Sequence, residues 1–198
     1  MDSEKIEWIG KVENPGWKLD KWKVVPMITR TYHEYPDMKW YVFVEADSYI
    51  FWRSIIQYLN SLDHTKYHYS GSGMYIGDDL FAHGGSGFFV SQAAMRTVVN
   101  FYTAHQLEIE DATDRHWAGD CILGEVFKDA GVFTDSYPIF EGDYPGMVPC
   151  SRSNGRSSAN DEERLWCYPS VSYHHVTPKV IEDLWRFEQH WFTSDQRV

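Results

Sequence analysis

The chain has 198 residues, of which 43% are hydrophobic and 17% aromatic, enough to build the core of one domain and to exclude a long disordered protein. Its formal net charge of −11 opposes binding to nucleic-acid phosphates or to an anionic membrane surface. No run of about twenty apolar residues occurs, and the polar, acidic residues 1–4 are unlike a signal peptide. We therefore expect one domain over residues 1–198 without a membrane-inserted segment.

In chain order, the first periodic segment is residues 18–32, whose apolar positions follow a helical period that Pro26 should divide. Residues 40–44 are an unbroken run of aromatic and β-branched side chains, which predicts a strand buried on both faces of a sheet. Helical spacing then returns in residues 48–62. This order of elements predicts an α/β domain.

Two carboxylates follow the strand at 40–44 directly. Ligands of open α/β sheets bind at the carboxyl ends of strands, so we expect Glu45 and Asp47 at the mouth of a site. Paired hard oxygen ligands suit Mg²⁺ or Mn²⁺, and such an ion suits a diphosphate. The alternative is that Asp47 only caps the helix that follows.

A glycine-rich segment, residues 81–91, follows two short predicted strands at 66–70 and 74–76. Its glycines permit close approach of the backbone to another group, although a tight turn at a sheet corner explains them nearly as well. Residues 88–90 predict a short buried strand. Ser91 is expected to cap a helix whose apolar stripe ends at Tyr102.

Residues 107–115 are acidic and predict a loop or a frayed turn. Gly119 and Asp120 open a second clear helix, with Gly131 expected just beyond its C-terminal end. An acid at a helix start is often only a cap, so a functional role for Asp120 depends on what neighbouring loops bring to it.

The three cysteines are too scattered for a zinc site or a disulfide scaffold. Cys150 and Cys167 flank a polar, exposed loop at 151–163 and could pair if the compartment is oxidising. Cys121 is expected to be a buried thiol on its helix.

Residues 168–176 predict the last strand, which contains the adjacent histidines His174 and His175. Alternation along a strand sends neighbouring side chains to opposite faces, so we expect at most one ring to meet the carboxylates. An imidazole with one or two carboxylates is reasonable coordination for Mn²⁺. The final helix should begin at residues 177–178. Its predicted buried stripe is Val180, Leu184, Phe187 and Trp191.

Four segments, in this order, resemble motifs of the fringe-like and core-1 beta-1,3-galactosyltransferase group of glycosyltransferases, particularly its divergent fungal members. Residues 40–49 are similar to the tryptophan-led strand that ends in an aspartate triplet followed by Thr-Tyr. Residues 81–91 are similar to the glycine-rich GGAG segment of that family. Residues 119–124 resemble the acidic residue ahead of a glycine-containing helix, and residues 171–178 the Ser-Phe-His-aromatic-Val-x-Pro ending.

The resemblance implies a GT-A-like mixed sheet flanked by helices. It also implies an inverting, metal-dependent enzyme that moves a hexose from a UDP-sugar to a hydroxyl of a glycan or glycoprotein acceptor. Mn²⁺ (or Mg²⁺) is the implied cofactor. Asp47 becomes the principal metal-binding carboxylate, with Glu45 beside it, and His174 becomes the other protein ligand.

The same resemblance makes Asp120 the candidate general base for the acceptor hydroxyl. Gly84 and Gly85 would let the backbone lie close to the transferred sugar. Trp117 is a candidate for stacking on an acceptor sugar. A full-length family member would work in the Golgi or secretory lumen.

Two features depart from the family pattern. Ala46 replaces the middle carboxylate of the triplet, and Glu45 lengthens the first. The family's βαβ nucleotide-binding portion, of roughly 100 residues, has no counterpart ahead of residue 40. Both departures favour an alternative, a catalytically inactive relative that binds glycans or partners. A metal-dependent phosphoesterase would use similar ligands, but its closely grouped motifs are not apparent.

Overall fold

The computed structural model describes residues 15–136, 140–143 and 170–194. The predicted loop at 151–163 and the pair Cys150 and Cys167 lie outside these residues. In the described part, the helices are α1 (Pro15–Asp20), α2 (Val24–Glu34), α3 (Trp52–Leu59), α4 (Gln92–Arg115), α5 (Gly119–Asp129) and α6 (Pro178–Ser194). The strands are β1 (Trp40–Phe43), β2 (Tyr49–Ile50), β3 (Tyr69–Gly71), β4 (Gly73–Ile76), β5 (Asp79–Ala82), β6 (Phe88–Ser91), β7 (Thr134–Ser136), β8 (Phe140–Asp143) and β9 (Ser172–His174).

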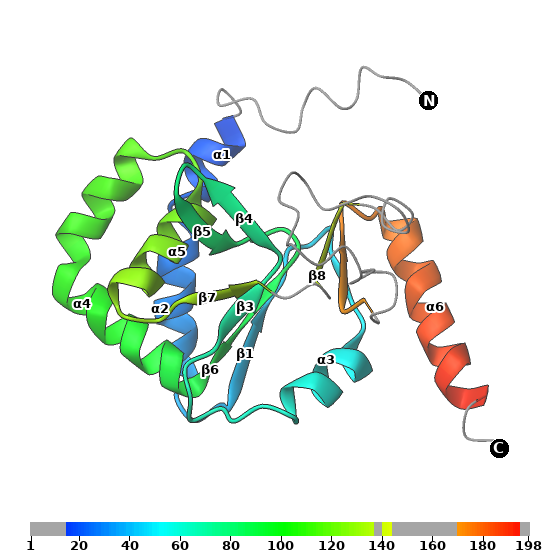
Figure 1. The fold of residues 1–198 in the computed structure, drawn as a ribbon. Helices are drawn as coiled ribbons and strands as arrows, with labels where there is room; N and C mark the ends of the chain where they lie inside the picture. The colour runs from blue at the N-terminus through cyan, green and yellow to red at the C-terminus, as the bar shows by residue number, and fades with distance from the viewer. Residues whose placement is uncertain (1–14, 137–139, 144–169, 195–198) are drawn as a thin grey trace, which may run out of the picture.

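The fold is mixed α/β and contains a mixed sheet flanked by helices, as predicted. The main sheet has the strand order β1-β6-β3-β7, in which β3 and β7 are parallel and the other pairs antiparallel. A second sheet has the order β2-β9-β8, and β4 pairs with β5 as a hairpin. Helices α2, α4 and α5 lie on one side of the main sheet, and α3 and the second sheet on the other (Figure 1).

Strand β1 is buried on one face and half-buried on the other, so the prediction of burial on both faces is confirmed only in part; among the described strands it is an edge strand. Tyr41 and Phe43 join the large core formed with α2, α4 and α5. Trp40 and Val42 face the other way and pack into the smaller core with Phe89 and α3. Alternating side chains of one strand thus connect the two layers.

Three predicted helix ends are confirmed by their hydrogen bonds. Ser91 Oγ accepts from the Ala94 N–H, and Thr177 Oγ1 accepts from the Val180 N–H. After α5, Gly131 has a φ of 80°, its N–H donates to the Lys128 carbonyl, and the next N–H donates to the Phe127 carbonyl. This pair of bonds is a Schellman motif, for which glycine is the favoured residue.

Helix α4 continues through residues 107–115, so the predicted loop there is wrong. The helix is kinked at His105, where φ is −122° and ψ is 23°. Beyond the kink, Ile109 is 8% exposed and belongs to the main core. The buried side chains of Ile109 and Thr113 and the local ion pair of Asp111 with Arg115 stabilise an otherwise acidic segment as helix.

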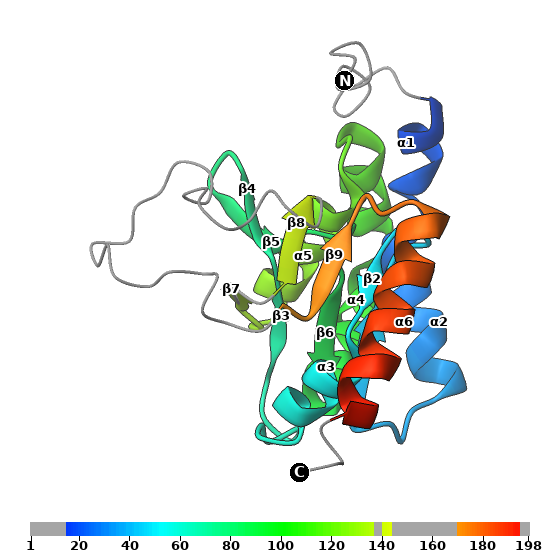
Figure 2. The ribbon, with the colours of Figure 1, turned by 90° about the vertical axis from the view of Figure 1, so that its right-hand side faces the viewer.

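Helix α6 lies beside the second sheet (Figure 2), and its predicted stripe is only partly buried. Val180 and Leu184 are half-buried, whereas Phe187 and Trp191 are 54% and 56% exposed. Among the residues of this helix whose burial is described, Glu188 is the buried one, and its Oε2 accepts a 2.6 Å hydrogen bond from Tyr49 Oη. The expected apolar contact is therefore replaced, at the centre of the helix, by a polar one.

None of the helices in the described ranges is both long enough and apolar enough to span a membrane.

Candidate metal centre

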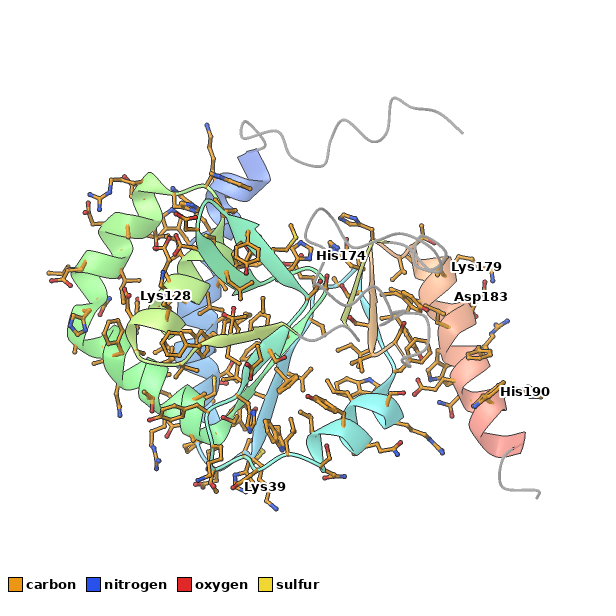
Figure 3. All side chains as sticks on the ribbon, viewed as in Figure 1. Lys39, Lys128, His174, Lys179, Asp183 and His190 are labelled. Atoms are coloured by element: carbon orange, nitrogen blue, oxygen red, sulfur yellow. The ribbon has the colours of Figure 1, made fainter. Side chains whose placement is uncertain are left out.

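The site lies where the ends of β1, β5 and β9 meet a five-residue turn, residues 83–87, which we call the site loop. Figure 3 labels His174 near the centre of the view, to the left of the labelled residues on α6. The site loop is held by several hydrogen bonds. Gly85 O accepts from Ser48 Oγ at 2.5 Å, and Ser86 O accepts from Ser172 Oγ at 2.6 Å. The loop is therefore fixed to the residues after β1 and to β9.

Asp47 lies in the turn between β1 and β2. Its carbonyl accepts a 2.9 Å hydrogen bond from the Val176 N–H, which joins this turn to the residues after β9. Helix α3 begins five residues later, with Phe51 as its N-cap, so the predicted helix from residue 48 starts too early and Asp47 does not cap it. The Asp47 side chain is 49% exposed and is open to solvent.

His174 and His175 both point toward Asp47, so the expectation that at most one would do so is wrong. Strand β9 ends at His174, and His175 has a φ of 55°, which breaks the strand alternation. The two rings stack with centroids 3.7 Å apart. His174 Nε2 lies 3.7 Å from Asp47 Oδ1. One ligand atom from each of these three residues lies within 4.8 Å of the others.

These three residues, which we call the metal triad, offer two imidazole nitrogens and one carboxylate oxygen. Ligand atoms about 2.2 Å from a common ion lie no more than ~4.4 Å apart, so a small inward movement of the side chains completes the coordination. Three protein ligands leave positions open for oxygens from outside the protein. The triad can thus hold a divalent metal ion and a ligand of that ion.

Glu45, the other predicted metal ligand, is not part of this group among the described residues. Its Oε1 lies 3.3 Å from Lys23 Nζ, at the start of α2. The Glu45 carbonyl accepts from the Ser48 N–H and so closes the turn that carries Asp47. The role that the structure assigns to Glu45 is an ion pair beside the site.

Asp120, the predicted base, is linked to the site loop. Its Oδ2 accepts a 3.0 Å hydrogen bond from the Gly84 N–H, and its Oδ1 accepts from the Cys121 N–H. Ala118 is the N-cap of α5, so Asp120 is not the cap but lies in the first turn, where the helix dipole favours a carboxylate. The site loop therefore contacts Asp120 through Gly84 and His174 through Gly85.

Gly85 is required by its contact with His174. A Cβ added to Gly85 would lie 2.3 Å from His174 Cε1 and 2.4 Å from His174 Nε2, far inside van der Waals contact. A Cβ at Gly84 would lie 3.4 Å from Asp120 Cβ, which is an ordinary contact. These glycines bring the backbone against two side chains of the site.

Trp117 precedes α5 by two residues, near Asp120 in the chain, and is 41% exposed. Its ring lies nearly parallel to that of His116, with centroids 6.0 Å apart. An exposed aromatic face is therefore present close to the start of the helix that carries Asp120.

Cys121 is 1% exposed, so the predicted buried thiol is confirmed. Burial, together with the nearby carboxylates of Glu125, Asp79 and Asp120, raises the pKa of this thiol to about 12. A thiol that stays protonated at neutral pH is a poor nucleophile, so Cys121 is a packing residue.

His83 is a site residue that the sequence argument did not single out. Its ring lies edge-to-face with the ring of His174, with centroids 5.2 Å apart and an interplanar angle of 71°. The feature of the sequence that indicates His83 is its position directly before Gly84 and Gly85. Strand alternation does not predict His175 as a second ligand, because it does not anticipate a positive φ.

In comparisons with known proteins, no protein-family model matches the chain, and no curated protein gives a significant sequence match.

Proposed function

We propose that the protein is an inverting, metal-dependent glycosyltransferase of GT-A-like fold, which moves a hexose from a UDP-sugar to an acceptor hydroxyl. The observation that supports this function most is the arrangement around the site loop. Asp47 and His174 approach each other to 3.7 Å, and Asp120 is hydrogen-bonded to the same loop through Gly84. The motif resemblance assigns Asp47 and His174 as metal ligands and Asp120 as the base.

The metal triad would hold Mn²⁺, which at this position takes up the negative charge that develops on the departing diphosphate. Asp47 supplies an anionic oxygen, and His174 and His175 supply neutral nitrogens. Because two of three ligands are imidazoles, this set suits Mn²⁺ better than Mg²⁺.

Asp120 would act as the base that receives the proton of the acceptor hydroxyl. The acceptor oxygen forms a bond to the anomeric carbon, the bond from that carbon to the phosphate oxygen breaks, and the proton passes to the carboxylate. Each Asp120 oxygen accepts one backbone N–H and keeps a further lone pair for this proton. Trp117, near the start of the same helix, would stack on the acceptor sugar.

A full-length protein of this kind would act in the Golgi or secretory lumen on a glycan or glycoprotein. The second candidate function is an inactive relative that binds a glycan or a partner. It is favoured by Ala46, which removes one carboxylate of the triplet, and by the ion pair that occupies Glu45.

Thermal unfolding with a UDP-sugar, with and without Mn²⁺, separates these functions at the binding step. We expect Mn²⁺ to be required for the UDP-sugar to raise Tm, and we expect Asp47→Ala and His174→Ala to abolish the increase. Asp37→Asn is the matched control, because Asp37 is exposed and precedes β1, at the other end of that strand from Asp47. A UDP-sugar effect that persists without Mn²⁺ or in both alanine variants would contradict the proposal.

Asp120→Asn tests the chemical step. The amide still accepts the Gly84 N–H but is a far weaker base, so we expect donor binding to be retained and sugar transfer to fall by at least about 100-fold. Transfer is measured as UDP release in the presence of a panel of acceptor glycans. Equal losses of donor binding and sugar transfer would contradict the role of Asp120 as the base.

A further inference from the structure

A third histidine of the site, His83, occupies the start of the site loop, directly after β5. Its N–H donates to the Ser72 carbonyl at 2.8 Å, which fixes its backbone. The next residue, Gly84, donates its N–H to Asp120. The His83 ring lies edge-to-face with the His174 ring, with centroids 5.2 Å apart. His83 is thus the chain neighbour of the residue that binds the proposed base and the ring neighbour of one residue of the metal triad.

Ser86 determines which nitrogen of His83 carries the proton. The Ser86 N–H donates to His83 Nδ1 at 3.3 Å, and Ser86 Oγ lies 2.8 Å from the same nitrogen. A backbone N–H can only donate, so Nδ1 is an acceptor and the proton of the neutral ring is on Nε2. Ser86 is fully buried, and its carbonyl is held by Ser172. The Nε2–H is therefore a donor with a preorganised orientation.

An ion held by the metal triad would have the His83 ring as a neighbour, because this ring lies against that of His174. The ion lies about 2 Å from a histidine nitrogen, and a phosphate oxygen lies about 2 Å beyond the ion. Such an oxygen would extend about 4 Å from the His174 nitrogen, and the His83 ring is a direct neighbour of the His174 ring, with ring centres 5.2 Å apart. In a chain of net charge −11, an anionic ligand also needs such local donors.

We propose that His83 Nε2–H donates a hydrogen bond to a phosphate oxygen of the metal-bound nucleotide diphosphate. This role rests on the proposed function, because it requires that the ligand of the ion is a diphosphate. The His83 hydrogen bond would stabilise the negative charge that develops on the departing diphosphate, as the ion would.

The test uses two amide substitutions that differ only in where they place a donor. His83→Gln puts an amide N–H₂ about where Nε2 lies, whereas His83→Asn puts its amide near the Nδ1 position. Calorimetric titrations would measure the affinity for Mn²⁺ alone, and then the affinities for UDP and for inorganic pyrophosphate in the presence of Mn²⁺. Thermal unfolding checks that both variants fold.

We expect both variants to bind Mn²⁺ alone like the wild type. His83→Asn should weaken UDP and pyrophosphate binding by about tenfold, the size expected for loss of a charge-assisted hydrogen bond, while His83→Gln stays within about threefold of the wild type. Equal UDP affinity in both variants and the wild type would overturn the role. So would a loss for UDP but not for pyrophosphate, or a loss of Mn²⁺ binding itself. A wild type that does not bind UDP with Mn²⁺ would contradict the proposed function as well.

Discussion

Among single residues, Gly85 carries the strictest steric requirement of the site. No side chain fits there unless the His174 ring moves, because the added Cβ would overlap both Cε1 and Nε2. This requirement links a backbone position in the site loop to the geometry of a proposed metal ligand more than eighty residues away in the chain.

Gly85→Ala should therefore weaken Mn²⁺ binding by at least about tenfold and lower the free energy of unfolding by about 1–3 kcal/mol, the usual cost of overpacking. Gly84→Ala is the matched control, since its Cβ would make an ordinary contact. Calorimetric metal titration and urea unfolding measure the two effects. Equal metal affinity in both alanine variants would show that the close contact with His174 does not matter.

His175 provides a second prediction at this scale. His175→Phe keeps a ring beside His174 but removes one nitrogen of the metal triad, so Mn²⁺ affinity should fall by about tenfold. The ratio of Mn²⁺ affinity to Mg²⁺ affinity should also fall, because the variant keeps only one of the two imidazole ligands. Competition titrations with the two ions test both points. An unchanged Mn²⁺ affinity would exclude His175 as a ligand.

At the scale of elements, α6 is attached to the second sheet through a buried polar pair. Tyr49 Oη donates to Glu188 Oε2, and Tyr49 pairs with Tyr173 in the register of β2 and β9. Tyr49 is two residues from Asp47, and Tyr173 is next to His174. The anchor of α6 therefore contacts a pair of strands whose ends adjoin the metal triad.

Tyr49→Phe removes the hydrogen-bond donor and leaves a buried carboxylate with one contact fewer. We expect the free energy of unfolding to fall by about 1–3 kcal/mol. Glu188→Gln can still accept from Tyr49, so its loss should be smaller. A double-mutant cycle measured by urea unfolding gives the coupling between the two positions. A coupling energy near zero would show that this pair does not anchor the helix.

The same pair predicts a pH dependence. Burial, and then the hydrogen bond to Glu188 and its charge, raise the pKa of Tyr49 above its ordinary value. The stability that this group contributes is complete below the unfolded pKa of about 10 and is lost as the pH rises toward the higher folded value. Urea unfolding should thus show a smaller alkaline loss of stability in Tyr49→Phe than in the wild type. An identical alkaline loss in both proteins would contradict this assignment.

The elements also show what sequence patterns can predict. The caps at Ser91, Gly131 and Thr177 were predictable because each depends on residues within one helical turn. The helical state of residues 107–115 was not, because it depends on the burial of Ile109 against distant helices. The exposed part of the α6 stripe was missed for the same reason, since a tertiary contact of Glu188 sets the orientation of that helix.

At the scale of the whole molecule, the site is assembled from segments that are distant in sequence. The order of the motifs predicts Asp47, Asp120 and His174 as site residues, and the structure arranges them around the site loop. The mixed sheet was expected, but the strand order β1-β6-β3-β7 was not, because pairing between distant strands leaves little local trace. The second histidine likewise depended on a backbone conformation that no pattern indicated.

The central claim is that one ion, held by the metal triad, also binds the diphosphate of a sugar nucleotide. Pulsed electron paramagnetic resonance of the protein with Mn²⁺ and UDP tests it directly, because the spectrum reports nuclei bound close to the ion. We predict nitrogen couplings from imidazole ligands together with phosphorus coupling from UDP, and loss of the nitrogen couplings in a His174→Ala and His175→Ala double variant. Mn²⁺ that shows no imidazole nitrogen, or no phosphorus when UDP is present, would contradict the claim.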